Sequence, residues 1–139
     1  MAMHVVLDTN VLVAGLLTPH GPPGRVIDLI LNGDLTPCFD DRILAEYREV
    51  LSRPKFGLDP DQIEAVLDYI EGERLHFIAK PLDISLPDPD DRAFLEMAVA
   101  AEAECLITGN PRHFPAKSRY GLRVIGPREF IEQWPPNPE

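Results

Sequence analysis

The chain has 139 residues, a formal net charge of −10 and 45% hydrophobic residues. A chain of this length folds as one domain around one core, so a single site must account for its function. The negative charge argues against a general polyanion binder, because long-range repulsion opposes the approach of phosphate backbones. The longest apolar runs, such as residues 11–17, are too short to span a bilayer, so we expect no membrane partner.

The sequence carries no sign of export. No basic segment or cleavage site precedes the first apolar run, and Cys38 and Cys105 stand apart among apolar neighbours. These features are typical of a reduced, cytoplasmic protein rather than of a disulfide-bonded secreted one. We expect one domain over residues 1–134 and a proline-rich, frayed tail over residues 135–139.

The first half of the chain alternates short apolar runs with helical patterns. In chain order these patterns predict a strand at 4–7, helices at 11–17 and from the 21–24 turn to Gly33, a strand at 36–39 and a helix from Asp40-Asp41 to about Leu51. The strand at 4–7 is β-branched and stops at the polar Asp8, which is typical of a central strand.

The second half continues the same rhythm. It predicts a helix at about 59–73, a strand at 76–79, a helix from 88 to about 102, strands at 105–107 and 122–125, and a last helix from Pro127. Alternation of this kind indicates an α/β, doubly wound fold, with about five strands in a mostly parallel sheet and helices on both faces.

Polar residues follow the predicted strands where a parallel sheet binds its ligands. Asp8 ends the first strand, Asn110 follows the strand at 105–107, and Asp91 lies in the first turn of the preceding helix. Ligands of open parallel sheets bind outside the carboxyl ends of the strands, at the point where the connections change sides. We therefore expect these three side chains to converge on one crevice.

Glu46 lies at the edge of the apolar face of its predicted helix, beside Val50 on a helical wheel. A carboxylate in that position is costly unless it is paired or bound to a cation. Glu46 is therefore a candidate ligand, whereas Glu49 lies on the outer face. The alternative is a glutamate that extends from the edge of the helix into solvent.

The segment Asp88-Pro89-Asp90-Asp91 also allows two interpretations. Asp88 and Asp91 suit the capping positions of a helix that starts at Pro89. Three acids within four residues also repel one another unless a cation or the helix dipole offsets their charge. We expect at least one of them to bind metal, and the sequence does not show which.

Clustered carboxylates favour a hard divalent cation such as Mg²⁺ or Mn²⁺, which can supply an activated water for phosphodiester hydrolysis. The sequence contains no Gly-rich phosphate loop and no Gly-x-Ser-x-Gly nucleophile turn. From Pro111 to Arg128 the chain has basic residues and no acidic one. Candidate RNA contacts in this stretch are Arg112, His113, Lys117 and Arg119, and a solvated basic loop is the alternative.

Four motifs occur in order along the chain: Val6-Leu7-Asp8-Thr9-Asn10, Glu46-x-x-x-Val50-Leu51, Asp88-x-Asp90-Asp91 and Leu106-Ile107-Thr108-Gly109-Asn110. Together they resemble the PIN-domain family, and most closely its bacterial and archaeal branch of type II toxin–antitoxin ribonucleases. The resemblance runs from about residue 4 to residue 130.

The resemblance implies a Mg²⁺- or Mn²⁺-dependent endoribonuclease whose catalytic, metal-binding acids are Asp8, Glu46 and Asp91. Thr9, Asn10 and Thr108 match the polar residues that surround the metal, and Asp88 is a further supporting residue. It also implies an RNA substrate, a homodimer and a cognate antitoxin protein.

The sequence departs from the family at Asn110, where many relatives carry an aspartate. An amide binds a second cation more weakly than a carboxylate, so the resemblance favours one tightly bound ion. Asp90 or Asp88 would then supply the missing charge. Asn110 itself stays in the set of candidate metal ligands.

Three alternatives remain. A haloacid-dehalogenase-like phosphatase needs Asp-x-Asp after the first strand, where this chain has Asn10 as the third residue. A receiver domain needs a phosphoacceptor aspartate after the third strand, where this chain has Ala79-Lys80-Pro81. The last alternative is a PIN-like module that has lost its activity and binds nucleic acid or protein.

Overall fold

The computed structural model describes residues 2–136 and shows a four-stranded parallel sheet. Its strand order is β2-β1-β3-β4. The strands are β1 (Met3–Leu7), β2 (Leu35–Pro37), β3 (Cys105–Ile107) and β4 (Val124–Ile125). All three pairings are parallel, so the carboxyl ends of the strands lie at one edge of the sheet.

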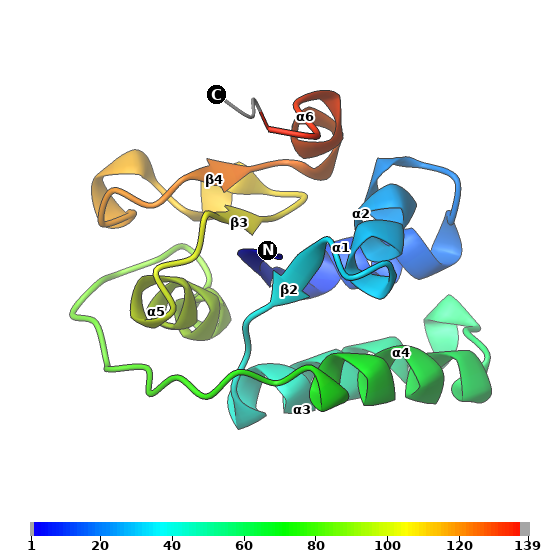
Figure 1. The fold of residues 1–139 in the computed structure, drawn as a ribbon. Helices are drawn as coiled ribbons and strands as arrows, with labels where there is room; N and C mark the ends of the chain where they lie inside the picture. Colours follow the sequence, from blue (N-terminus) through cyan, green and yellow to red (C-terminus); the bar gives the residue numbers. More distant parts are fainter. Residues whose placement is uncertain (1, 137–139) are drawn as a thin grey trace.

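Helices cover both faces of the sheet, which confirms the doubly wound arrangement (Figure 1). One layer holds α1 (Thr9–Leu17), α2 (Pro22–Leu31) and α6 (Pro127–Glu132), and the other holds α3 (Asp41–Leu51), α4 (Pro60–Gly72) and α5 (Arg92–Ala100). Short 3₁₀ turns join them: η1 (Pro54–Phe56), η2 (Pro89–Asp91), η3 (Pro111–His113) and η4 (Ala116–Ser118).

The direction of the connections changes at β1. The chain leaves β1 through α1 and α2 to reach β2 on one side, and it returns through α3, α4 and α5 to β3 on the other. Backbone pairing continues past the ends of the strands, because the Asp8 nitrogen donates a 2.9 Å hydrogen bond to the Ile107 oxygen. The switch point of the sheet therefore lies beside Asp8.

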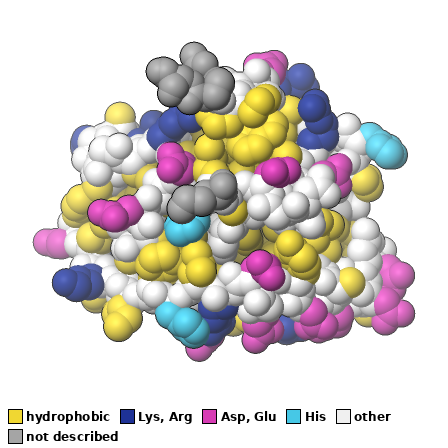
Figure 2. Space-filling model, in the orientation of Figure 1, with side chains coloured by type: hydrophobic (Ala, Val, Ile, Leu, Met, Phe, Trp, Pro, Cys, Tyr) yellow, Lys and Arg dark blue, Asp and Glu magenta, His cyan; other side chains and the backbone are white. Residues whose placement is uncertain are grey.

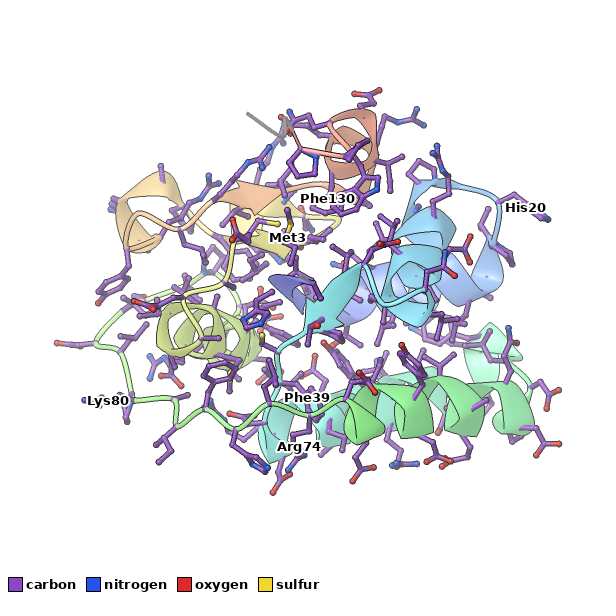
Figure 3. All side chains as sticks on the ribbon, in the orientation of Figure 1. Met3, His20, Phe39, Arg74, Lys80 and Phe130 are labelled. Atoms are coloured by element: carbon purple, nitrogen blue, oxygen red, sulfur yellow. The ribbon has the colours of Figure 1, made fainter. Side chains whose placement is uncertain are left out.

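The predicted strand at 76–79 is wrong, and the sheet has four strands rather than about five. Residues 74–87, here called the strap, form an extended segment outside the sheet. Its alternation is genuine, since Phe77 and Ala79 pack against the core while Ile78 is 88% exposed. Side chains hold it in place of a strand partner, and Lys80 points into solvent (Figure 3). Period-two burial alone does not distinguish such a strap from a strand.

Two side chains of the neighbouring helix hold the strap. The Leu82 nitrogen donates a 3.0 Å hydrogen bond to Glu96, and Arg92 donates a 2.8 Å bond to the Ile84 carbonyl oxygen. Glu96 is only 4% exposed and also pairs with Arg42 at 2.7 Å. The strap leads directly to Asp88, so these contacts fix the approach to η2.

The helix predicted from residue 88 is divided into η2 and α5. Asp88 caps the first part, because its side chain accepts a 3.0 Å hydrogen bond from the Asp90 nitrogen. The predicted capping interpretation of Asp88 is therefore confirmed. Asp91 lies at the junction of the two elements, where its backbone begins α5 without a side-chain cap.

The surface charge is uneven. Acidic side chains gather over α4, at the lower right of the face in Figure 2. Exposed acids on this helix include Asp61, Glu64, Asp68 and Glu71. At the amino end of α3, by contrast, a basic side chain accompanies an acid. The Arg74 guanidinium lies 4.8 Å from the Phe39 ring centroid and donates a 2.7 Å bond to Asp41 (Figure 3).

Near the C-terminus, Trp134 stacks on Phe130 with ring centroids 5.8 Å apart and packs against the core. Pro135 and Pro136 are exposed, and residues 137–139 of the predicted tail lie outside the described residues, as does Met1. Among residues 2–136, the structure contains no helix with the length and apolar character needed to cross a membrane.

Candidate metal centre

Asp8 stands between β1 and α1 and is 5% exposed. One of its carboxylate oxygens accepts a 2.8 Å hydrogen bond from the Thr108 hydroxyl group at the end of β3. Burial raises the pKa of Asp8, and the bond from Thr108 opposes that rise only in part. Thr108 therefore orients the carboxylate, while the surroundings disfavour its negative charge.

Glu46 reaches the same point from α3. Asp40 caps this helix by accepting a 3.1 Å hydrogen bond from the Ile43 nitrogen. The Glu46 carboxylate is half-buried and accepts a 2.7 Å bond from the Thr9 hydroxyl group. Burial raises the pKa of Glu46, and the nearby carboxylate of Asp8 raises it further. Thr9 and Thr108 thus hold one acid each.

Asp91 is 7% exposed at the start of α5. Its Oδ2 atom is buried and has no hydrogen-bond partner among the described residues. The Nδ1 atom of His113 lies 3.3 Å from that oxygen, as an ion-pair contact without hydrogen-bond geometry. Burial, followed by repulsion from Asp8 and Asp88, raises the pKa of Asp91 to about 7. This oxygen lacks the partner that a buried carboxylate needs.

The three acids line one pocket of about 450 Å³. Its polar wall is formed by Asp8, Thr9, Asn10, Glu46, Asp88, Asp91 and His113. Its apolar wall is formed by Val13, Ala14 and Leu17 of α1, Val50 of α3 and Phe56 of η1. The pocket lies at the switch point of the sheet, as the sequence predicts for a ligand site.

The chemistry of this pocket fits a hard divalent cation. Carboxylates with raised pKa values face one pocket without a lysine or arginine in its walls, and the Asp91 oxygen lacks a donor. Within residues 2–136, no three acidic, histidine or cysteine side chains are already grouped at ligand distance. Thr9 and Thr108 each bond one oxygen of Glu46 and Asp8, so a cation could be bound by the remaining carboxylate oxygens and by Asp91.

The other predicted ligands differ in their placement. Asp88 lines the pocket, whereas Asp90 is exposed and outside its walls. Asn110 also lies outside the walls: its side-chain nitrogen is 3.1 Å from the Nε2 atom of His113, and its backbone nitrogen donates to Thr108. Asn10 lines the pocket and accepts a 3.0 Å bond from the Gly109 nitrogen, which ties α1 to the end of β3.

The predicted RNA-contact residues separate into different positions. His113 lines the pocket, while Arg112 and Lys117 are exposed on η3 and η4. Arg119 is turned towards the protein, where it donates to the Phe114 oxygen at 2.6 Å and to the Pro111 oxygen at 3.3 Å. Arg119 therefore shapes the loop after β3.

The sequence does not reveal two features of this site. The hydroxyl group of the fully buried Tyr47 donates a 2.6 Å bond to the Leu7 oxygen, although the helical wheel indicates only that Tyr47 is apolar core. His113 stands beside Asp91, although nothing near it in the sequence suggests a carboxylate partner. Sequence spacing carried no signal for either contact.

The comparisons with known proteins decide the family. The PIN domain model matches residues 4–112. The chain belongs to the PIN-domain family. This match spans the elements that carry Asp8, Glu46 and Asp91, and PIN domains are typically nucleases that use divalent metal ions. The chain is also similar to the uncharacterized protein MJ1680 of Methanocaldococcus jannaschii, with 26% identity over 94% of this chain and 90% of that protein. No solved structure matches.

Proposed function

We propose that this PIN domain is an endoribonuclease that depends on Mg²⁺ or Mn²⁺ and acts as the toxin of a type II toxin–antitoxin pair. The observation that carries the proposal is the convergence of Asp8, Glu46 and Asp91 from three separate elements on one pocket. Burial disfavours the negative charge of each acid and raises its pKa, and a bound cation would offset that cost.

When bound, a divalent cation would supply Lewis-acid stabilisation of the phosphate charge and activation of water for attack. Asp8, Glu46 and Asp91 are the residues that would hold it. Thr9 and Thr108 keep the carboxylates of Glu46 and Asp8 oriented before the ion arrives, through bonds of 2.7 and 2.8 Å. Val13, Leu17 and Phe56 form an apolar wall on one side of the site.

We propose one tightly bound ion rather than two. Asn110 is neutral and contacts His113 instead of lining the pocket, so it offers little to a second cation. Asp88 lines the pocket and is the residue best placed to add charge. Its Oδ1 atom accepts the bond from the Asp90 nitrogen, and no further hydrogen bond to its side chain is found among residues 2–136.

The RNA substrate, the homodimer and the antitoxin partner rest on the resemblance to the toxin branch. The four motifs occur in the order and spacing of that branch, which supports the same chemistry here. Exposed Arg112 and Lys117 provide positive charge near a pocket that is otherwise negative. An acidic protein needs such a local contact before RNA can approach its site.

Cleavage assays test the proposal. Wild-type protein is incubated with a structured RNA panel in Mn²⁺, Mg²⁺ or EDTA, beside Asp8→Asn and Glu46→Gln variants. Glu49→Gln is the matched control, because Glu49 lies on the same helix but on the exposed side. We expect metal-dependent cleavage by wild type and Glu49→Gln only. RNA or protein binding without cleavage in any metal would support the inactive binding module instead.

The toxin role has its own test. Expression of wild-type protein from an inducible promoter should arrest bacterial growth, and the Asp8→Asn variant should not. Co-purification of a protein encoded beside this gene, with relief of arrest, would identify the antitoxin. If cells that express the wild-type protein grow normally while the purified protein cleaves RNA, the protein is a nuclease and the toxin role is contradicted.

A further inference from the structure

A second and larger pocket lies between the strap and the loop that follows η3. Its volume is about 690 Å³. Both segments lie at the left of the molecule, beside α5 (Figure 1). One wall is formed by residues 83–87 of the strap, and the other by Pro115, Lys117, Ser118 and Tyr120. Pockets of this size hold small organic ligands.

The walls of this second pocket adjoin those of the metal centre along the chain. Pro87 in its first wall is followed directly by Asp88, which lines the metal centre. Pro115 in its second wall comes two residues after His113, which also lines the metal centre. The same two segments therefore border both pockets in succession. We call the second pocket the furrow.

Tyr120 is the aromatic side chain of the furrow and is 56% exposed. Its φ angle is 54°, in the left-handed region that a bulky side chain rarely adopts. Glycine or asparagine would fit this backbone with less strain. A ring that is both exposed and conformationally unfavourable indicates a role at the surface rather than in the core.

Charge in the furrow is divided between its walls. Lys117 is exposed on one wall, and Asp83 is exposed on the other. Arg119 is engaged by the Phe114 and Pro111 carbonyl oxygens, so it holds the loop and leaves Lys117 as the cation that faces the furrow. Ser85 and Ser118 add hydroxyl groups that can bond to the edge of a base.

We propose that the furrow binds a nucleotide of single-stranded RNA beside the scissile phosphate, with the base stacked on Tyr120 and a phosphate paired with Lys117. An exposed aromatic ring beside a cation is the usual means of binding unpaired nucleotides. A duplex cannot use this site, because its bases are stacked on one another. The inference rests on the proposed ribonuclease activity and specifies an unpaired substrate for it.

Binding of a short fluorescein-labelled single-stranded RNA, measured by anisotropy in the Asp8→Asn background, tests the furrow. We expect Tyr120→Ala to weaken binding about 5- to 150-fold, as for the loss of one stacked base. Tyr120→Phe keeps the ring and should bind within about twofold of the parent. Lys117→Ala should weaken binding and lower its dependence on salt concentration.

Tyr120→Gly separates binding from folding. Glycine relieves the strained φ angle, so this variant should melt at the same or a higher temperature while it loses RNA affinity. A lower melting temperature would instead assign Tyr120 a structural role and overturn the proposal. The proposal would also be overturned if a duplex RNA bound as tightly as the single strand and this binding depended on Tyr120.

Failure of the furrow differs from failure of the nuclease. Metal-dependent cleavage with an unchanged KM in Tyr120→Ala would overturn the furrow and leave the nuclease in place. If the protein instead binds RNA through Tyr120 and cleaves nothing in any metal, that result would support the furrow and overturn the nuclease. Both effects together, with KM raised and kcat nearly unchanged in Tyr120→Ala, support both proposals.

Discussion

The hydroxyl group of Tyr47 donates a 2.6 Å hydrogen bond to the carbonyl oxygen of Leu7. Leu7 ends β1 immediately before Asp8, and Tyr47 follows Glu46 on α3. The bond thus joins the two backbones that carry two proposed ligands. Burial raises the pKa of Tyr47 well above its ordinary value, so the hydroxyl group stays a donor at any pH the fold tolerates.

Tyr47→Phe should loosen this connection without removing the ring from the core. Loss of one buried hydrogen bond is expected to lower the free energy of unfolding by about 1 kcal/mol. Affinity for Mn²⁺ should fall several-fold, because Glu46 is less firmly placed relative to Asp8. Urea unfolding and calorimetry measure the two effects. Tyr69→Phe is the control, and equal metal affinity in both variants would argue against the positioning role.

Asp91→Asn should abolish cleavage and yet stabilise the metal-free protein. The change removes a buried charge that has no donor and that Asp8 and Asp88 repel. At pH 8 in EDTA, the free energy of unfolding of the variant should exceed that of wild type by about 1–3 kcal/mol. Equal or lower stability would show that the contact with His113 already compensates for the charge.

Stability of the metal-free protein should depend on pH in the range set by these acids. The pKa of Asp91 is about 7 in the fold, and those of Asp8 and Glu46 are also raised. At a pH between the pKa values of the unfolded chain, near 4, and the raised pKa values of the fold, the native state holds protons that the unfolded chain has released. Its free energy of unfolding therefore falls as pH rises through this range.

Melting temperatures in EDTA across pH 5–8 measure this effect. The difference between Asp91→Asn and wild type should grow with pH, and a saturating concentration of Mn²⁺ should remove the loss in wild type. Parallel curves for the two proteins at every pH would contradict a raised pKa at Asp91.

Arg42→Ala should release the strap. Arg42 pairs with the buried Glu96, and Glu96 accepts the hydrogen bond from the Leu82 nitrogen. Without the arginine, a buried carboxylate loses its cation, at an expected cost of about 1–3 kcal/mol. Hydrogen exchange of the Leu82 amide should accelerate. Arg48→Ala, which breaks an exposed pair with Glu64, should cost less than about 1 kcal/mol and leave that amide unchanged.

Much of the fold followed from local patterns. The β-branched run before Asp8 and the proline at the start of α4 each predicted the correct element, because they depend on neighbours in the chain. The Asp88-Pro89 pair predicted the start of a helical segment but not its division into η2 and α5. The strand predicted at 76–79 failed because pairing depends on a free sheet edge elsewhere in the molecule. In its place, Glu96 and Arg92 hold an extended segment by side chains, which no local pattern encodes.

The residues of the site also divide into those predicted from their local position and those that act through distant contacts. Asp8 and Asp91 were predicted from their places at strand and helix ends, and Glu46 from its edge position on α3; all three line the pocket. The same argument placed Asn110 with them, and Asn110 lies outside the pocket walls. Tyr47 and His113 act through contacts with residues far away in the sequence, at Leu7 and Asp91. Such contacts depend on how α3 and η3 are oriented, so composition and spacing do not reveal them.

The edge strand β2 ends at Pro37, and this residue limits how two copies of the chain can meet. The Cys38 nitrogen donates to the Val5 oxygen of β1, so the neighbouring Pro37 nitrogen faces outwards and has no hydrogen to offer. The opposite edge, β4, has only two residues. Both edges are therefore poor templates for adding a foreign strand. We expect self-association of this chain to use surfaces other than these two edges.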